Sequence, residues 1–189
     1  DIVIKSVSGT GIELNFGNTN LSLDRIIIEQ TTGPGMILSD GNHRFTNIWI
    51  NTTNSTCTST LGCDLRGSTV TTPSIVNFTN ITLVTPQFNA LDPDYEFFFS
   101  NLTFDNATAA VRYPNISWNS YSFNLDGNIS LSFNRTIISS TRAGPLNTSA
   151  VISLRDLMAT EAKAYVDYED TNTFINCPTS RCTSETYSV

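Results

Sequence analysis

Short segments in which apolar and polar residues alternate recur along this chain, and this period of two constrains the fold more than any other feature. In an extended strand, alternate side chains point to opposite faces of a sheet. The clearest segment is 128–134, whose inward face carries Ile129, Leu131 and Phe133 and whose outward face carries Asn128 and Asn134. Residues 101–104 have the same phase, with Leu102 and Phe104 inward and Asn101 outward. Alternation of this kind predicts strands with one buried and one solvated face.

β-branched and aromatic residues dominate the further candidate strands, as strands prefer. These are residues 11–16, 21–30, 44–50, 69–76, 81–85, 95–99 and 121–125. Turn signals separate them, and Asp126-Gly127 predicts a tight hairpin between 121–125 and 128–134. Many short strands at this spacing predict an all-β chain folded as a β-sandwich.

Two segments depart from simple alternation. Phe78 and Ile81 have opposite parity, which predicts a bulge or a break near Thr79–Asn80. Residues 153–164 have a helical pattern, because Ser153 can cap a helix whose apolar face would carry Leu154, Leu157 and Met158. We therefore expect one short helix in an otherwise all-β chain.

Acceptor sequons for N-linked glycan, Asn-x-Ser/Thr, are unusually dense. The chain has 20 Asn and 48 Ser plus Thr among 189 residues, from which about five sequons are expected by chance. Eleven are present, starting at Asn20, Asn51, Asn54, Asn77, Asn80, Asn101, Asn106, Asn115, Asn128, Asn134 and Asn147. Because N-linked glycan occurs on extracellular surfaces, this excess predicts a heavily glycosylated extracellular protein.

Charge and composition exclude several classes of function. The net charge is −7 and only 14% of residues are charged, compared with about 25% in ordinary soluble domains. No basic stripe is present, so we expect neither nucleic acid nor an anionic membrane as a partner. No apolar run reaches the ~18–20 residues of a membrane span, and a start at Asp1 without Met is what cleavage of a signal peptide leaves.

The sequence contains few of the residue patterns that catalytic sites require. His43 is the single histidine, and its neighbours Ser39 and Asp40 share a turn with it rather than forming a catalytic triad. No phosphate-binding glycine loop and no zinc-type cysteine spacing is present. We therefore expect no enzyme activity, no cofactor and no metal site.

The cysteines form two close pairs, Cys57 with Cys63 and Cys177 with Cys182. In an extracellular protein this spacing favours two local disulfides, although three connectivities are formally possible. Such small loops would each add roughly 2 kcal/mol of stability.

The first residues suggest a separate role. Residues 1–7 are apolar on both faces, with Ile2 and Ile4 on one side and Val3 and Val7 on the other, and Lys5 between them. Residues 8–11 are a Gly- and Ser-rich hinge, and 12–189 would form the glycosylated sandwich domain. Residues 1–7 are either a first strand of this sandwich or a donor strand that completes the sheet of a neighbouring copy. Donor-strand contacts are heterologous and propagate head to tail.

With this N-terminal segment, hinge, sequon set, lysine-poor composition and paired cysteines, the chain resembles the glycosylated thread-type pilins of thermoacidophilic archaea. The resemblance implies an immunoglobulin-like sandwich completed by donor-strand exchange, identical subunits as partners, and a cell-surface filament serving adhesion, aggregation or biofilm formation. The alternative is a monomeric glycoprotein binding module, such as an adhesin or receptor ectodomain. Some surface pilins carry isopeptide cross-links, for which the only lysines are Lys5 and Lys163; an ordinary solvated Lys5 is the simpler expectation.

Overall fold

The computed structural model describes residues 1–14, 20–38, 41–51, 65–67, 74–84, 95–119, 129–133, 135–139, 144–155, 165–166 and 173–182. The chain divides into two compact units, 1–155 and 156–189. Among the described residues the secondary structure is strand, apart from one 3-10 turn, η1, at Gly144–Leu146. The prediction of an all-β chain is therefore confirmed.

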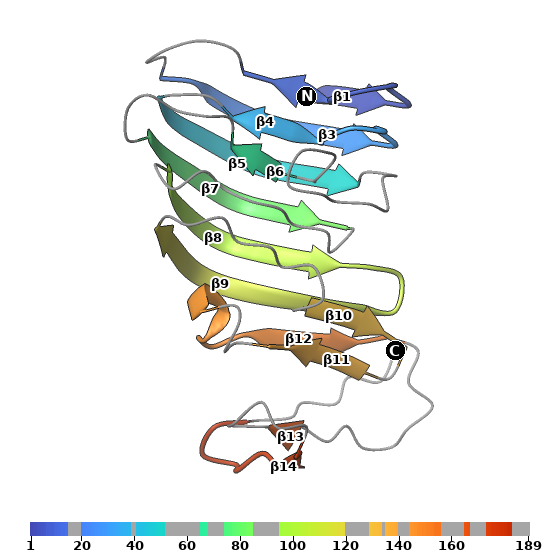
Figure 1. Cartoon of the computed structure of the whole chain (residues 1–189), viewed down its shortest axis with the longest axis vertical. Coiled ribbons are helices and arrows are strands. Elements are labelled where there is room, and N and C mark those ends of the chain that lie inside the picture. Colours follow the sequence, from blue (N-terminus) through green and yellow to red (C-terminus); the bar gives the residue numbers. More distant parts are fainter. Residues whose placement is uncertain are drawn as a thin grey trace. The chain divides into compact units, whose positions relative to one another are not determined.

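The first unit contains a larger, seven-stranded mixed sheet, a smaller, three-stranded parallel sheet and a two-stranded hairpin. The larger has the order β1 (Ile2–Lys5), β3 (Ser22–Glu29), β5 (Asn42–Asn51), β7 (Ser74–Leu83), β8 (Tyr95–Asp105), β9 (Ala109–Asn119) and β12 (Val151–Leu154), stacked in that order in Figure 1. The smaller has the order β2 (Ile12–Glu13), β4 (Met36–Leu38) and β6 (Leu65–Gly67). A separate hairpin joins β10 (Ile129–Ser132) to β11 (Arg135–Ile138).

The chain alternates between these two sheets from β1 to β7, and each return adds a parallel strand beside the previous one. This is the winding of a parallel β-helix, in which successive coils stack and bury a continuous core between them. β8 adds one more parallel strand, and then β9 and β12 pair antiparallel, which ends the coil pattern.

In-register stacking places like residues next to one another in the core. One column runs Ile26, Ile48, Ile81 and Leu102, all of them buried. A second runs Leu23, Phe45, Phe78 and Phe99, in which the ring of Phe78 lies 5.1 Å from that of Phe45 and 5.2 Å from that of Phe99. The smaller sheet adds Met36, Leu38 and Leu65 to the same buried cluster. Each coil thus covers its neighbour's apolar side chains.

The strands β3, β5, β7 and β8 of the larger sheet each bend at one residue in the left-handed backbone conformation. The φ angles are +55° at Arg25, Asn47 and Asn80 and +60° at Asn101. Such a residue interrupts the alternation, and Phe78 and Ile81 are consequently both buried. The break predicted near Thr79–Asn80 is confirmed. Asn tolerates this conformation better than most residues, whereas Arg does not.

The immunoglobulin-like sandwich is not confirmed. Both sheets of that fold are antiparallel, whereas β1, β3, β5, β7 and β8 run parallel. The physical reason for the difference is that alternation of apolar and polar residues specifies the two faces of a strand and not the direction of its neighbour.

Two further predictions differ from the structure, and others concern residues that the structure does not describe. Ser153 and Leu154 belong to β12, where they pair with Ala110 and Ala109 of β9, so the predicted helix does not begin there. Pairing with an available sheet edge prevails over a weak cap. Phe133 was expected inward but is 54% exposed, because it lies in the turn between β10 and β11. The remainder of the predicted helix, 156–164, and the predicted strand 121–125 with its Asp126-Gly127 turn lie outside the described residues.

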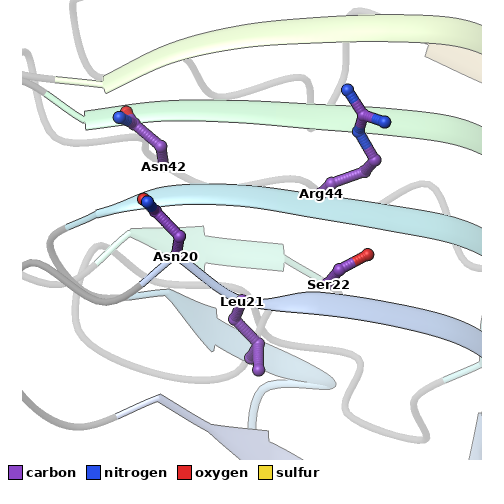
Figure 2. Close-up of a pocket in the computed structure, with 5 residues that line it drawn as sticks. All are labelled: Asn20, Leu21, Ser22, Asn42 and Arg44. Atoms are coloured by element: carbon purple, nitrogen blue, oxygen red, sulfur yellow. The ribbon is translucent and has the colours of Figure 1, made fainter.

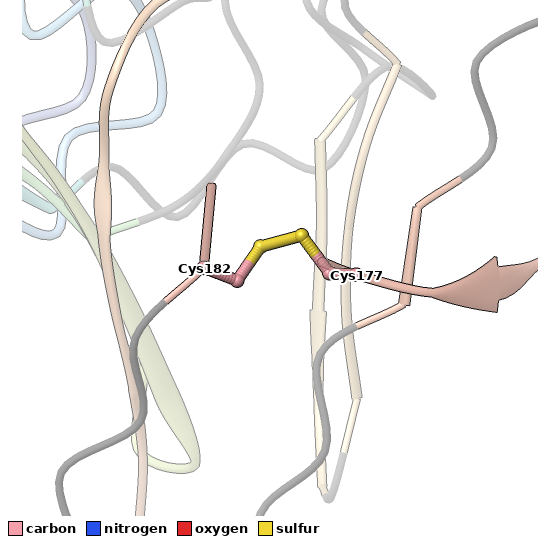
Figure 3. Close-up of a disulfide and its surroundings, with 2 residues drawn as sticks. All are labelled: Cys177 and Cys182. Carbon is pink, nitrogen blue, oxygen red and sulfur yellow. A yellow bond between two sulfur atoms is a disulfide. The ribbon is translucent and has the colours of Figure 1, made fainter. Parts of the chain in front are cut away.

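The second unit contains one short antiparallel pair, β13 (Tyr165–Val166) with β14 (Ile175–Asn176). Directly after β14, a disulfide joins Cys177 to Cys182 with a Cα–Cα distance of 5.9 Å (Figure 3). The local pairing predicted for these two cysteines is confirmed. Cys57 and Cys63 lie outside the described residues.

Candidate functional site

The predicted glycan acceptors occupy different environments. Asn20, Asn80, Asn115 and Asn147 are exposed, and Asn51, Asn77, Asn101 and Asn106 are half-buried. Asn54, Asn128 and Asn134 lie outside the described residues. The sequon pattern alone did not separate these environments.

A ladder of side-chain amides follows the bends of the long strands. Asn47 Nδ2 donates to Asp24 Oδ1 at 2.9 Å, Asn80 Nδ2 donates to Asn47 Oδ1 at 2.9 Å, and Asn101 Nδ2 donates to Asn80 Oδ1 at 3.0 Å. The same asparagines thus adopt the left-handed backbone conformation and connect adjacent coils through side-chain hydrogen bonds. We call Asn47, Asn80 and Asn101 the asparagine ladder.

A repeated tetrapeptide marks this ladder in the sequence, and alternation of apolar and polar residues does not reveal it. The three copies are Phe45-Thr46-Asn47-Ile48, Phe78-Thr79-Asn80-Ile81 and Phe99-Ser100-Asn101-Leu102. In each copy the aromatic and aliphatic residues are buried and the Asn occupies the bend. Internal repetition of this kind is the signal that indicates stacked coils.

Asn106 has a separate structural role at the turn between β8 and β9. Its Oδ1 accepts hydrogen bonds from Thr108 N at 2.9 Å, Thr108 Oγ1 at 3.0 Å and Ala109 N at 2.9 Å. Its Nδ2 donates to Leu131 O at 2.9 Å and so holds the β10–β11 hairpin against this turn. Side chains of Asn commonly stabilise turns in this way.

The predicted interface segment pairs within its own chain. Residues Ile2, Val3, Ile4 and Lys5 align with 26–29 of β3 in parallel register. Two ion pairs reinforce this contact: Lys5 Nζ lies 2.7 Å from Glu29 Oε2, and Arg25 Nε lies 2.5 Å from Asp1 Oδ1. Beyond the strand, Thr32 N donates to Val7 O at 3.1 Å. Lys5 is thus ion-paired with Glu29, and Lys163 lies outside the described residues.

The hinge predicted at 8–11 packs into the same compact unit. Gly33 N donates to Gly9 O at 3.0 Å, and Gly11 N donates to Pro34 O at 2.9 Å. A Cβ on Gly11 would lie 2.6 Å from both Gly35 O and Ile28 Cγ2, so only glycine fits there. The boundary between compact units falls after Arg155, not within the first eleven residues.

Both outer strands of the larger sheet carry exposed apolar side chains. On β1, Ile2 is 41% and Val3 53% exposed; on β12, Val151 is 47% and Ile152 50% exposed. We call the outer side of β1 the β1 edge and the outer side of β12 the β12 edge. A terminal strand presents backbone donors and acceptors to a further strand.

A shallow hollow of about 210 Å³ opens beside the start of β3 and β5. Figure 2 shows its lining residues, Asn20, Leu21, Ser22, Asn42 and Arg44. In this lining Arg44 supplies one positive charge and Ser22 a hydroxyl, and none of the five residues is a carboxylate.

Elsewhere in the described part of the chain, His43 and Tyr113 carry polar groups within the core. His43 is buried in the core, with its ring 6.0 Å from that of Phe45. Burial raises the pKa of Tyr113 above its ordinary value of 10.0, so its phenol stays neutral. The described residues hold no cluster of His, Cys, Asp and Glu able to bind a metal ion. They also contain no helix with the length and apolarity of a membrane span.

The chain matches no protein-family model, no curated protein and no solved structure.

Proposed function

We propose that this protein is a structural subunit of an extracellular, glycosylated cell-surface filament, and that copies join head to tail through the β1 edge of one and the β12 edge of the next. The observation that carries this proposal is that the two outermost strands of one sheet both expose neighbouring apolar residues, Ile2 and Val3 on one, Val151 and Ile152 on the other. Extracellular placement is supported by the Cys177–Cys182 disulfide and by the sequon density.

The two edges are different surfaces, so a contact between them is heterologous. A heterologous contact whose rotation does not close produces an open filament rather than a dimer. The parallel coils favour such growth, because the sheet of one copy would continue into the sheet of the next through main-chain hydrogen bonds. The resemblance to archaeal surface filaments supports adhesion or aggregation as the role of the filament.

Donor-strand exchange, the form expected from the sequence, would use the same N-terminal segment differently. The segment 1–7 would leave β3 and enter a neighbouring sheet, which would break four aligned residue pairs and the Lys5–Glu29 and Asp1–Arg25 ion pairs. Edge addition keeps all of these contacts, and we therefore favour it over exchange.

Each junction would be small. Four-residue strands extend only about 13 Å, and stable protein interfaces usually bury about 1,200 Å² or more. Assembly through the two edges is therefore expected to be concentration-dependent and reversible, unless other surfaces add to it.

A mixing experiment tests the proposal. We expect Val3→Lys and Ile152→Lys each to remain monomeric at concentrations at which the unmodified chain forms filaments, and an equimolar mixture to form dimers, since one intact edge of each kind remains. Analytical ultracentrifugation with negative-stain electron microscopy measures this. Phe133→Lys, which replaces an equally exposed apolar residue in a turn, should still polymerise.

Three outcomes contradict the proposal. If the unmodified chain stays monomeric up to millimolar concentration, the protein is a monomeric module. If only Val3→Lys disrupts assembly, the contact is between two β1 edges or is an exchanged strand. If Phe133→Lys disrupts assembly as strongly as the edge variants, the edges are not the contact.

A further inference from the structure

We propose that the fold divides six of the described sequons into two classes, and that among these six only those whose carboxamide nitrogen Nδ2 holds no neighbouring strand or turn in place carry glycan. The acceptors are Asn20, Asn115 and Asn147, and the unmodified residues are Asn80, Asn101 and Asn106. This inference rests on the proposed glycosylated, extracellular nature of the protein and adds to it a specific pattern of occupancy.

Two of the excluded sequons lie in the asparagine ladder. N-linked glycan is attached to Nδ2, and in Asn80 this nitrogen lies 2.9 Å from Asn47 Oδ1, while Asn80 Oδ1 lies 3.0 Å from Asn101 Nδ2. Asn80 therefore has a carboxamide on either side, in a row spaced about 4.8 Å by the strands. A bulky sugar on Nδ2 has to displace a member of this row.

Strand pairing of the backbone also makes these two sequons inaccessible to a glycosyltransferase. Asn80–Thr82 lies inside β7 and Asn101–Thr103 inside β8, and each strand is paired on both sides. Withdrawing either tripeptide into an enzyme requires opening the sheet. A chain modified before folding would keep a single Nδ2–H and would have to fit the sugar between neighbouring carboxamides at a residue with positive φ, which disfavours the folded, secreted form.

Asn106 is excluded by its own hydrogen bonds. Its Nδ2 is committed to Leu131 O, and Thr108 Oγ1, the hydroxyl that defines this sequon, donates to Asn106 Oδ1 at 3.0 Å. Glycan at this position would separate the β8–β9 turn from the β10–β11 hairpin.

In the three proposed acceptors, Nδ2 donates no such hydrogen bond to another described residue. Asn20 and Asn147 are exposed outside the strands, next to β3 and η1. Asn115 is exposed on β9; its Oδ1 accepts a hydrogen bond from Ser100 Oγ at 3.3 Å, and its Nδ2 has no hydrogen-bond partner among the described residues. A sugar on any of these nitrogens can extend into solvent.

Glycopeptide mapping of the full chain, secreted from a glycosylating host, tests the pattern. Enzymatic release of glycan in ¹⁸O-labelled water converts each occupied Asn to labelled Asp, which mass spectrometry locates. We expect label at residues 20, 115 and 147 and none at 80, 101 and 106. Label at 80, 101 or 106 overturns the inference and leaves the proposed function standing. Absence of label along the whole chain overturns both.

Two matched variants test glycan occupancy independently, because each removes a sequon without altering its asparagine. Thr103→Val removes the sequon of Asn101 and should leave the intact mass of the secreted protein unchanged apart from the substitution. Ser117→Ala removes the sequon of Asn115 and should remove the mass of one glycan. A lost glycan in Thr103→Val, or an unchanged glycan mass in Ser117→Ala, refutes the division into two classes.

Discussion

Replacing Asn47 separates the two contributions of the asparagine ladder to stability, and it does so without a glycan complication because Asn47 is not in a sequon. Its carboxamide makes two hydrogen bonds of 2.9 Å, to Asp24 and from Asn80. Each is worth about 0.5–1.5 kcal/mol. Its backbone has φ +55°, a conformation that costs a non-glycine residue roughly 1–2 kcal/mol.

We therefore expect Asn47→Ala to lower the free energy of unfolding by about 2–4 kcal/mol, since it loses both hydrogen bonds and places alanine in the left-handed region. Asn47→Gly loses the same hydrogen bonds but tolerates the backbone, and should be about 1 kcal/mol more stable than Asn47→Ala. Urea unfolding followed by circular dichroism gives both values from the midpoints, provided that the slope is unchanged.

The matched control is Asn42→Ala, at an exposed position on the same strand where φ is not positive. It should cost less than about 0.5 kcal/mol, as surface substitutions usually do. If Asn47→Ala costs no more than this control, the ladder does not stabilise the coils. If Asn47→Ala and Asn47→Gly are equally stable, the left-handed backbone at this position is not a real constraint.

The remaining predictions concern the core and the second unit. Phe78→Ala should cost about 3–5 kcal/mol in urea unfolding, because Phe78 is 1% exposed between two stacked rings; a loss below 1 kcal/mol would contradict the stacked core. The pKa of Tyr113 is raised in the folded state, so its contribution to stability is fully present below the unfolded value of 10.0 and is lost as pH rises above it. Tyr113→Phe should abolish this alkaline decline and leave neutral-pH stability equal or higher, since the hydroxyl is buried with no hydrogen-bond partner among the described residues; an unchanged decline would refute this. Cys177→Ser with Cys182→Ser should leave the main unfolding transition within 0.5 kcal/mol, because the disulfide closes a short loop in a unit separate from 1–155; a shift of several kcal/mol would show that the two units unfold together.

The strands could be predicted from the sequence because burial alternates along them whatever their partners are. The segments at 21–30, 44–50 and 95–99 correspond to β3, β5 and β8. Even the break near Asn80 was recoverable, since Phe78 and Ile81 could not both be buried without it.

Strand direction could not be predicted from alternation, which is the same in parallel and antiparallel sheets. The information lay instead in the repeat around Asn47, Asn80 and Asn101, whose register makes like residues stack. The repeat is hard to recognise at β3, because Arg25 instead of Asn occupies the left-handed position there. The hydrogen-bond acceptor for Asn47 Nδ2 is the neighbouring residue Asp24.

Sequons have a related limit as predictors of occupied glycan sites. A tripeptide pattern identifies an acceptor chemically, but it does not show whether the carboxamide is free or bonded to the next coil. Ser153 illustrates the same limit for caps: the local signal for a helix is present, yet pairing with β9 makes the residue part of a strand.

The spacing of subunits along the native filament is the most direct test of the proposed assembly. If the β1 edge of one copy joins the β12 edge of the next, the larger sheet continues without interruption, and each copy adds seven strands to it. At about 4.8 Å per strand, helical reconstruction by electron cryomicroscopy should give a rise of about 34 Å per subunit, with β1 beside a neighbour's β12. A rise unrelated to this value, or residues 1–7 found inserted between two strands of the neighbouring copy, would contradict edge-to-edge assembly.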